Sequence, residues 1–126
     1  MAVSALIVAP FQTASAGACD VAHDLPNNAI TASWYGKEHR GLRTTSGEKF
    51  DERKLTAAHA TLPLNSVVEV TNLVNGKTVT VTVNDRGLND DGQIDLSLAA
   101  AKALGMVRCG LALVVLSVPS LHAAKK

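Results

Sequence analysis

The chain has 126 residues, of which 47% are hydrophobic, 18% are charged and only 3% are aromatic. This length supports one domain with one core, and the apolar content excludes a disordered chain. The formal net charge is +1. A phosphate-binding protein normally carries a basic excess, so no nucleic-acid partner is expected. With so few aromatic residues, the core must be built from Val, Leu, Ile and Ala.

The N-terminal segment as far as Cys19 has no ionisable side chain apart from that thiol. Residues 5–11 form a short apolar run, and Ala14-Ser15-Ala16 fits a signal-peptidase site, although no Lys or Arg precedes the run. We therefore predict an exported protein, periplasmic or secreted, with a signal peptide at 1–16 and a connector at 17–29. A frayed strand is the alternative. A transmembrane span is not expected, because a span needs about 20 apolar residues.

The two cysteines of the chain are Cys19 and Cys109. In an oxidising compartment they would form a disulfide that closes a loop of about 90 residues. The alternative is a lipoprotein anchored through an acylated Cys19, which would leave Cys109 as an odd thiol. The chain has no Cys-x-x-Cys pair, so neither a thioredoxin-type centre nor a zinc ribbon is expected.

Short β segments dominate the chain from residue 30 onward. Segments 67–72 and 77–83 flank Asn75-Gly76, a dipeptide that tolerates the positive φ angles of a type I′ hairpin turn. In the second segment Val alternates with Thr, so the Val face is predicted to lie in a core. Further strands are expected at 30–35, 55–58 and 111–118. The last is almost wholly apolar, which is typical of a strand covered on both sides.

One helix is predicted at 98–104, with Ser97 as its N-cap and Gly105 just after its end. Its small apolar face would pack onto a sheet. Several short strands with one short helix indicate a mainly β fold, a small barrel that leaves no strand edge exposed. The barrel domain is expected over 30–118, followed by a tail at 119–126.

Three polar side chains are candidates for chemistry. If the strand continues past Val83, Asp85 keeps the parity of the valines and points inward, where burial favours the protonated form that a general acid needs. The alternative is a simple Asn-Asp-x-Gly turn. His59 follows two alanines that leave room beside its ring, and Glu48 lies in a Gly-containing loop. Either could equally be structural or solvated. One imidazole and two carboxylates at no diagnostic spacing predict no metal site and no cofactor.

Several motifs in order carry a resemblance to a known family. They are Ala32-Ser33-Trp34-Tyr35-Gly36, Thr45-Ser46-Gly47-Glu48, Thr56-Ala57-Ala58-His59, Asn84-Asp85-Arg86-Gly87 and Ile94-Asp95-Leu96-Ser97. In these the chain resembles the rare lipoprotein A family over residues 31–118. The resemblance implies a six-stranded double-psi β-barrel, the fold of barwin-like proteins and of one expansin domain.

The resemblance also implies an activity. Members of that family are endolytic peptidoglycan transglycosylases that cleave the MurNAc–GlcNAc bond of stem-peptide-free glycan strands and leave 1,6-anhydroMurNAc ends. By motif, Asp85 is the expected catalytic acid, with Glu48 and His59 beside it. Trp34, Tyr35 and Arg86 are candidates for binding the glycan, although barrel packing is the alternative for the two aromatic residues. A monomer is expected. The alternative function is a non-catalytic, expansin-like wall-binding module.

Overall fold

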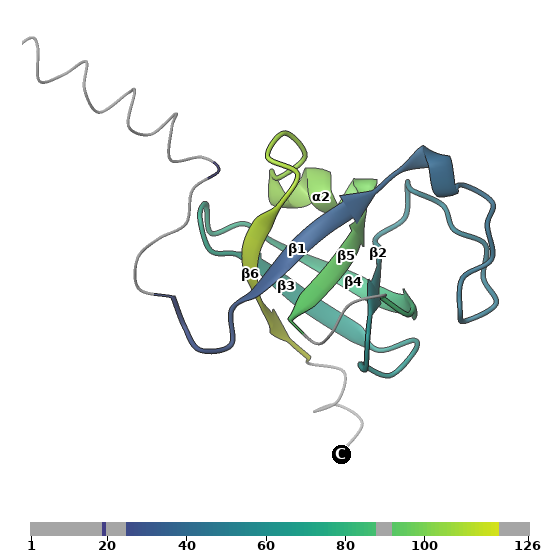
Figure 1. Ribbon diagram of the computed structural model, residues 1–126, viewed down its shortest axis with the longest axis horizontal. Helices are drawn as coiled ribbons and strands as arrows, with labels where there is room; N and C mark the ends of the chain where they lie inside the picture. The colour runs from purple at the N-terminus through teal and green to yellow at the C-terminus, as the bar shows by residue number, and fades with distance from the viewer. Residues whose placement is uncertain (1–18, 20–24, 88–91, 119–126) are drawn as a thin grey trace, which may run out of the picture.

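The computed structural model describes residues 19, 25–87 and 92–118 (Figure 1), and the predicted signal peptide and C-terminal tail lie outside them. In chain order the elements are β1 (Ile30–Tyr35), the 3-10 turn η1 (Lys37–His39), β2 (Thr56–His59), β3 (Val67–Asn72), β4 (Thr78–Asp85), β5 (Gln93–Ser97), α2 (Leu98–Leu104) and β6 (Ala112–Ser117). Within the described residues, no helix has the length and apolar character of a membrane span.

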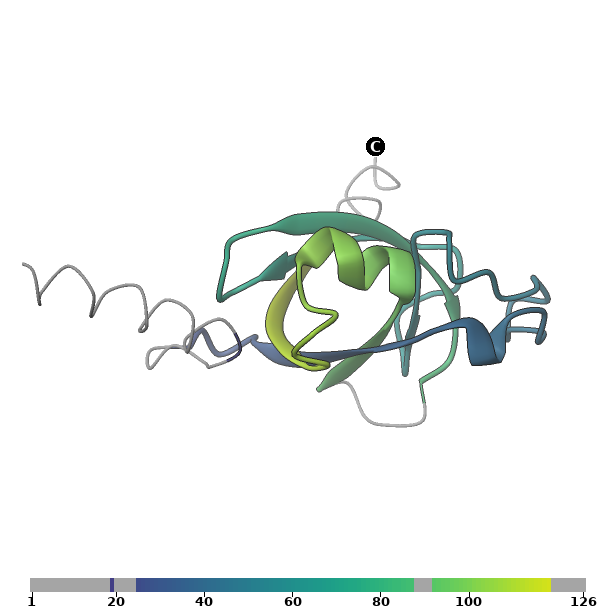
Figure 2. The ribbon, with the colours of Figure 1, turned by 90° about the horizontal axis from the view of Figure 1, so that it is seen from above.

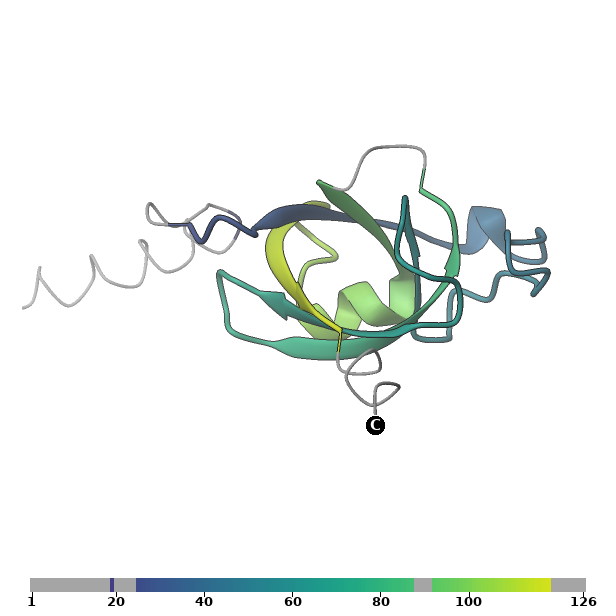
Figure 3. The same ribbon diagram turned by 90° about the horizontal axis from the view of Figure 1, so that it is seen from below.

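The strands close into a barrel in the order β1-β5-β2-β4-β3-β6, with β6 pairing back to β1. Two pairs, β1 with β5 and β2 with β4, are parallel, and the other pairs are antiparallel. The predicted closed barrel of six strands with one short helix is confirmed. Figures 2 and 3, which view the barrel from opposite sides, show α2 lying across one opening of the ring.

The barrel interior is filled by aliphatic side chains, as the low aromatic content predicted. On β4 the valines at 79, 81 and 83 are buried, while the threonines between them are exposed or half-buried. The same alternation on β5 buries Ile94 and Leu96 and leaves Gln93 and Asp95 half-buried. On β1, Ala32 is buried and Trp34 packs against the core. The polar residues between these core positions therefore lie on the outer face of the barrel wall.

The hairpin of β3 and β4 forms, but its turn is not the type I′ turn that the sequence suggested. The backbone N–H of Asn72 donates to the carbonyl of Lys77 at 2.8 Å, so that residues 73–76 form a four-residue loop. Gly76 has a positive φ of 76°, whereas Asn75 does not. A type I′ turn requires positive φ at both central residues. Instead, the Asn75 side chain reaches the end of α2 and donates to the Leu104 carbonyl at 2.9 Å.

The prediction that the apolar 111–118 segment is covered on both sides was wrong. On β6 only Val114 is fully buried, and Ser117 is exposed. Ala112 and Leu116 pack against the core, while Leu113 and Val115 alternate with them and are half-buried. The outer face of β6 is thus partly open to solvent, because α2 covers an opening of the barrel rather than this wall.

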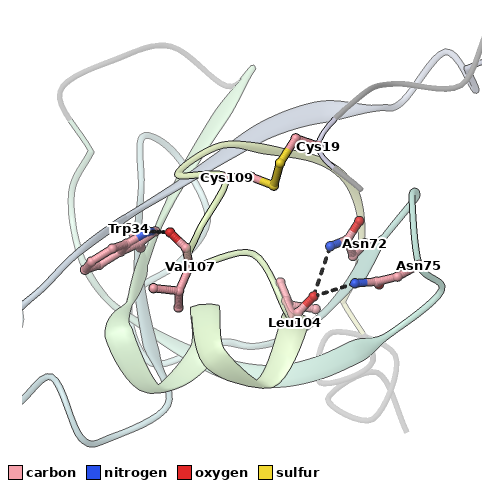
Figure 4. Close-up of a disulfide and its surroundings, with 7 residues drawn as sticks. All are labelled: Cys19, Trp34, Asn72, Asn75, Leu104, Val107 and Cys109. Atoms are coloured by element: carbon pink, nitrogen blue, oxygen red, sulfur yellow. Dashed lines mark hydrogen bonds between the residues drawn. A yellow bond between two sulfur atoms is a disulfide. The ribbon is translucent and has the colours of Figure 1, made fainter. Parts of the chain in front are cut away.

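The predicted helix α2 has the expected ends. The hydroxyl of Ser97 accepts from the Ala100 backbone N–H at 3.3 Å, and Gly105 ends the helix with φ 69°. The buried residues of the helix are Ala100, Ala101 and Leu104, which confirms the predicted face. The side chains of Asn72 and Asn75 both donate to the Leu104 carbonyl, which fastens the end of the helix to the β3–β4 hairpin (Figure 4).

The two cysteines form the predicted disulfide. Cys19 and Cys109 have Cα atoms 5.4 Å apart and are separated by 90 positions in the chain. Cys109 lies in the connection from α2 to β6, so the bond attaches the N-terminal connector to the barrel (Figure 4).

Candidate active site

A row of four directly paired residues crosses the outer face of the barrel wall. Ser33 on β1 pairs with Asp95 on β5, Asp95 pairs with Ala58 on β2, and Ala58 pairs with Asp85 at the end of β4. Residues paired in this way point to the same side of a sheet. The row therefore holds two carboxylates, one on each side of the small Ala58 side chain.

A β-bulge at Asn84 decides where Asp85 points. Between β2 and β4, Ala57 pairs with Val83 but the next residue, Ala58, pairs with Asp85, so Asn84 is the extra residue on β4. Parity with Val83 had predicted an inward-pointing Asp85. That prediction was wrong, because a bulge shifts the alternation of the strand beyond it. Asp85 is half-buried and lines a pocket on the outer face, together with Ala58 and Asp95.

The Asp85 carboxylate is held through one of its two oxygens. Its Oδ1 accepts hydrogen bonds from the backbone N–H of Thr45 at 2.9 Å, the Thr45 hydroxyl at 2.7 Å and the backbone N–H of Arg86 at 2.9 Å. Within the described residues, Oδ2 has no hydrogen-bond partner. The side chain is thus fixed in orientation by one oxygen and open at the other.

The loop that carries Glu48 is fastened to the bulge. The backbone N–H of Ser46 donates to the Asn84 carbonyl at 3.1 Å, and the Asn84 side-chain amide donates to Glu48 Oε1 at 3.0 Å. Asn84 is only 2% exposed, whereas Glu48 is exposed. Glu48 does not line the pocket, but the two contacts of Asn84 place it beside the same end of β4 as Asp85.

His59 lies at the end of β2, next to this end of β4, and its side chain is 4% exposed. Its Nδ1 accepts from the backbone N–H groups of Thr61 and Leu62, each at 3.2 Å, so the imidazole stabilises the turn that follows β2. The ring is not part of the pocket lining. Of the three predicted catalytic residues, the structure therefore places only Asp85 in the pocket and the other two beside it.

Arg86 connects the pocket to the turn after β2. Its guanidinium Nη1 donates to the carbonyls of His59 at 3.1 Å and Leu62 at 2.7 Å. Both bonds go to backbone oxygens, so the positive charge of Arg86 has no carboxylate partner within the described residues. The residue lines the pocket next to Asp85 and adds a cation to a site that otherwise holds two carboxylates.

The two aromatic residues of the first motif have different surroundings. The indole N–H of Trp34 donates to the Val107 carbonyl at 3.3 Å, and its ring packs against the core (Figure 4). Tyr35 stacks on Phe50 with ring centroids 4.6 Å apart and meets His39 edge-on at 5.0 Å. Its buried hydroxyl has no hydrogen-bond partner within the described residues. Burial, together with the negative charges of Asp85 and Asp95, raises the pKa of Tyr35 well above its ordinary value.

The pocket has a volume of about 220 Å³ and is lined by Ser33, Trp34, Tyr35, His39, Ala58, Asp85, Arg86 and Asp95. Sequence reasoning did not assign a role to Ser33 or Asp95. The signal was present, since each is a polar residue between two apolar ones in a β segment. Only the pairing across strands shows that they meet Asp85. The described residues contain no group of three or more His, Cys, Asp or Glu side chains arranged to hold a metal ion.

Residues 27–116 match the family model described as lytic transglycolase. The chain belongs to the lytic transglycolase family. The match spans the barrel except for Ser117, the last residue of β6, and includes both strands that carry the pocket carboxylates.

Curated relatives within this family confirm the resemblance to rare lipoprotein A. The chain is 58% identical over 83 residues to the endolytic peptidoglycan transglycosylase RlpA of Pseudomonas aeruginosa, which covers 65% of this chain and 24% of that protein. It is 55% identical over 82 residues to the RlpA of Vibrio cholerae, which covers 64% of this chain and 31% of that protein. The chain thus spans about a quarter to a third of the length of these relatives.

Solved structures support the fold of this lytic transglycolase family member. A Streptomyces papain inhibitor has a TM-score of 0.56 and 25% identity, covering 74% of this chain and 98% of the inhibitor. A Clavibacter michiganensis expansin in complex with cellohexaose has a TM-score of 0.60 and 19% identity, covering 72% of this chain and 49% of the expansin. The predicted double-psi barrel is confirmed by these neighbours.

Proposed function

We propose that this domain is an endolytic lytic transglycosylase that cleaves the MurNAc–GlcNAc bond of peptidoglycan strands, with Asp85 as the general acid. The observation that carries the proposal is the Asp85 carboxyl group itself. Three donors hold its Oδ1, its Oδ2 is open, and it lines the pocket at the end of β4. The names of the relatives from Pseudomonas and Vibrio support peptidoglycan as the substrate.

The geometry specifies which oxygen of Asp85 would transfer the proton. Because Oδ1 already accepts three hydrogen bonds, a proton on the carboxyl group sits on Oδ2. Oδ2 would donate this proton to the glycosidic oxygen as the bond to the muramyl anomeric carbon breaks. The muramyl C6 hydroxyl then closes on that carbon and gives its proton to the Asp85 carboxylate, which restores the acid and leaves a 1,6-anhydro end without a water molecule.

Glu48 and His59 would act beside this step. Glu48 is exposed and held by Asn84 at the rim of the site, where its second carboxylate oxygen can accept hydrogen bonds from sugar hydroxyls. His59 supports the turn whose carbonyls bind Arg86, and so positions that guanidinium in the pocket. Arg86 would bind polar groups of the glycan, and Tyr35 would contact the glycan through the part of its ring that lines the pocket. The packing of Trp34 assigns that residue to the barrel.

A substrate in the cell wall implies that the domain works outside the cytoplasm, in the periplasm or as a secreted protein. The Cys19–Cys109 disulfide supports this, because such bonds persist in oxidising compartments. The same bond engages the sulfur that a thioether-linked lipid would need, which favours export without an anchor at Cys19.

The Asp85→Asn variant tests the proposal. The amide oxygen can still accept from Thr45 and Arg86, so the fold is kept while the transferable proton is lost. Loss of a general acid lowers turnover by about 100-fold or more. The measurement is mass spectrometry of products from denuded peptidoglycan, with circular dichroism to check folding. The matched control is Glu69→Gln, which changes an exposed carboxylate on β3, away from the pocket, and should release 1,6-anhydro ends at the wild-type rate.

The alternative, an expansin-like module that binds the wall without cleaving it, is favoured by one observation, the barrel it shares with the Clavibacter expansin. The same assay separates the two functions. Wild-type protein that binds denuded glycan but releases no 1,6-anhydro ends would establish the binding module. Full activity in Asp85→Asn would show that another group is the acid.

A further inference from the structure

The pocket contains a second carboxylate that the proposed function does not yet use. Asp95 on β5 lies across Ala58 from Asp85, and both line the same pocket. The two residues pair with Ala58 from its two neighbouring strands. Since adjacent strands lie about 4.8 Å apart, their Cα atoms are separated by about 10 Å. Between them, the small side chain of Ala58 lines the same pocket.

Asp95 is held in the same way as Asp85. Its Oδ1 accepts from the Ser33 hydroxyl at 2.5 Å and from the Gln93 side-chain amide at 3.0 Å. Within the described residues its Oδ2 has no hydrogen-bond partner. Here Ser33 and Gln93, from two adjacent strands, fix one oxygen and leave the other available.

The hydroxyl of Tyr35 shows that both carboxylates face one space. It is buried among the pocket residues, and the charges of Asp85 and Asp95 both act on it to raise the pKa of Tyr35. Tyr35 therefore remains protonated. Asp85 and Asp95 line the same pocket as this side chain, and negative charge beside a reacting carbon stabilises positive charge that develops on it.

We propose that Asp95 is a second catalytic carboxylate, which acts in its ionised form across the pocket from Asp85 to stabilise positive charge on the muramyl anomeric carbon. This inference rests on the proposed function. In the step, the bond from the anomeric carbon to the glycosidic oxygen breaks as Asp85 gives that oxygen a proton. Positive charge accumulates on the anomeric carbon opposite Asp95, and the C6 oxygen then bonds to this carbon while its proton passes to the Asp85 carboxylate. Asp95 exchanges no atom and remains ionised throughout.

The test is the dependence of kcat on pH for Asp95→Asn, with denuded peptidoglycan as substrate. The wild type should require a protonated Asp85 and an ionised Asp95, so its rate falls on both sides of an optimum. Asp95→Asn should lower kcat by about 100-fold or more and remove the fall on the acid side, leaving only the alkaline one. If Asp95 had a purely structural role, the variant would have a lower rate but would keep both limbs of the profile, the fall on the acid side and the fall on the alkaline side.

Controls separate Asp95 from the other groups of the pocket. The titratable or charged groups that line it with Asp95 are Tyr35, His39, Asp85 and Arg86. His39 is an ionisable group that lines the same pocket, so His39→Gln is measured in parallel and should keep the acid limb. Glu69→Gln, on the exposed side of β3, should match the wild type throughout.

If Asp95→Asn fails to fold, Ser33→Ala replaces it, since this variant keeps the carboxylate and removes one donor from Oδ1. The acid limb should then move to higher pH, because the ionised form has lost a hydrogen bond. If the wild type is active and its Asp95→Asn variant keeps both limbs, the role of Asp95 is overturned while the proposed function stands. A wild type that releases no 1,6-anhydro product would overturn the proposed function and this inference with it.

Discussion

Removing the Cys19–Cys109 disulfide should leave the barrel folded but much less stable. The perturbation is the double variant Cys19→Ser with Cys109→Ser. The bond joins residues 90 positions apart. For a loop of that length, the chain-entropy relation gives about 4.6 kcal/mol at 25 °C, as an upper value for the loss in free energy of unfolding. All six strands lie at residues 30 to 117, and their pairing closes the barrel without the bond. The native fold is therefore expected to survive.

The assay is urea unfolding followed by circular dichroism, at a protein concentration equal for all samples. In a thermal melt of the same samples, a loss of about 4 kcal/mol should appear as a fall in Tm of about 10–20 °C for a domain of this size. Adding a thiol reductant to the wild type should reproduce the shift, and adding it to the double serine variant should change nothing. A loss below about 1 kcal/mol would refute the reasoning. It would mean that removing the bond raises the entropy of the folded protein, through the freed connector, by as much as it raises the entropy of the unfolded chain.

Two further predictions concern buried polar groups. Tyr35→Phe should raise the free energy of unfolding by about 1 kcal/mol, because it removes a buried hydroxyl without a partner and keeps the stack on Phe50; a thermal melt that falls instead would show that the hydroxyl is satisfied. The Arg40 guanidinium lowers the pKa of Glu52 from 4.5 to about 2. This pair stabilises the fold above about pH 4.5 and loses its effect as pH falls through 2. Arg40→Gln should therefore reduce the change in the free energy of unfolding between these two pH values, as measured by urea unfolding at a series of pH values.

Much of the local structure could be predicted from the sequence because it depends on neighbouring residues. The alternation of Val and Thr predicted β4 and its buried face, and Ser97 and Gly105 predicted both ends of α2. Strand β5 was not predicted as a strand from its pattern. Its five residues, Gln93–Ser97, contain only two buried apolar positions, Ile94 and Leu96, which is too short an alternation to indicate a strand by itself.

The candidate site was predictable only in part. The motif around Asp85 marked the residue, but its direction depended on the bulge at Asn84, which local alternation does not show. Likewise, the turn after β3 followed from the contact of Asn75 with the distant Leu104 carbonyl rather than from the dipeptide itself. In both cases a hydrogen bond or pairing from another part of the chain outweighed the local preference.

The sequence by itself determined the strand periodicity, the helix ends, the aliphatic core and the family. The tertiary structure alone decided which side chains share the pocket. Ser33, Asp95, Ala58 and Asp85 come from four strands, and they form one row only because the register of three strand pairs aligns them. Periodicity specifies the face on which a side chain lies, whereas register depends on the closure of the whole barrel. The position of Asp95 opposite Asp85 is therefore a property of the folded chain.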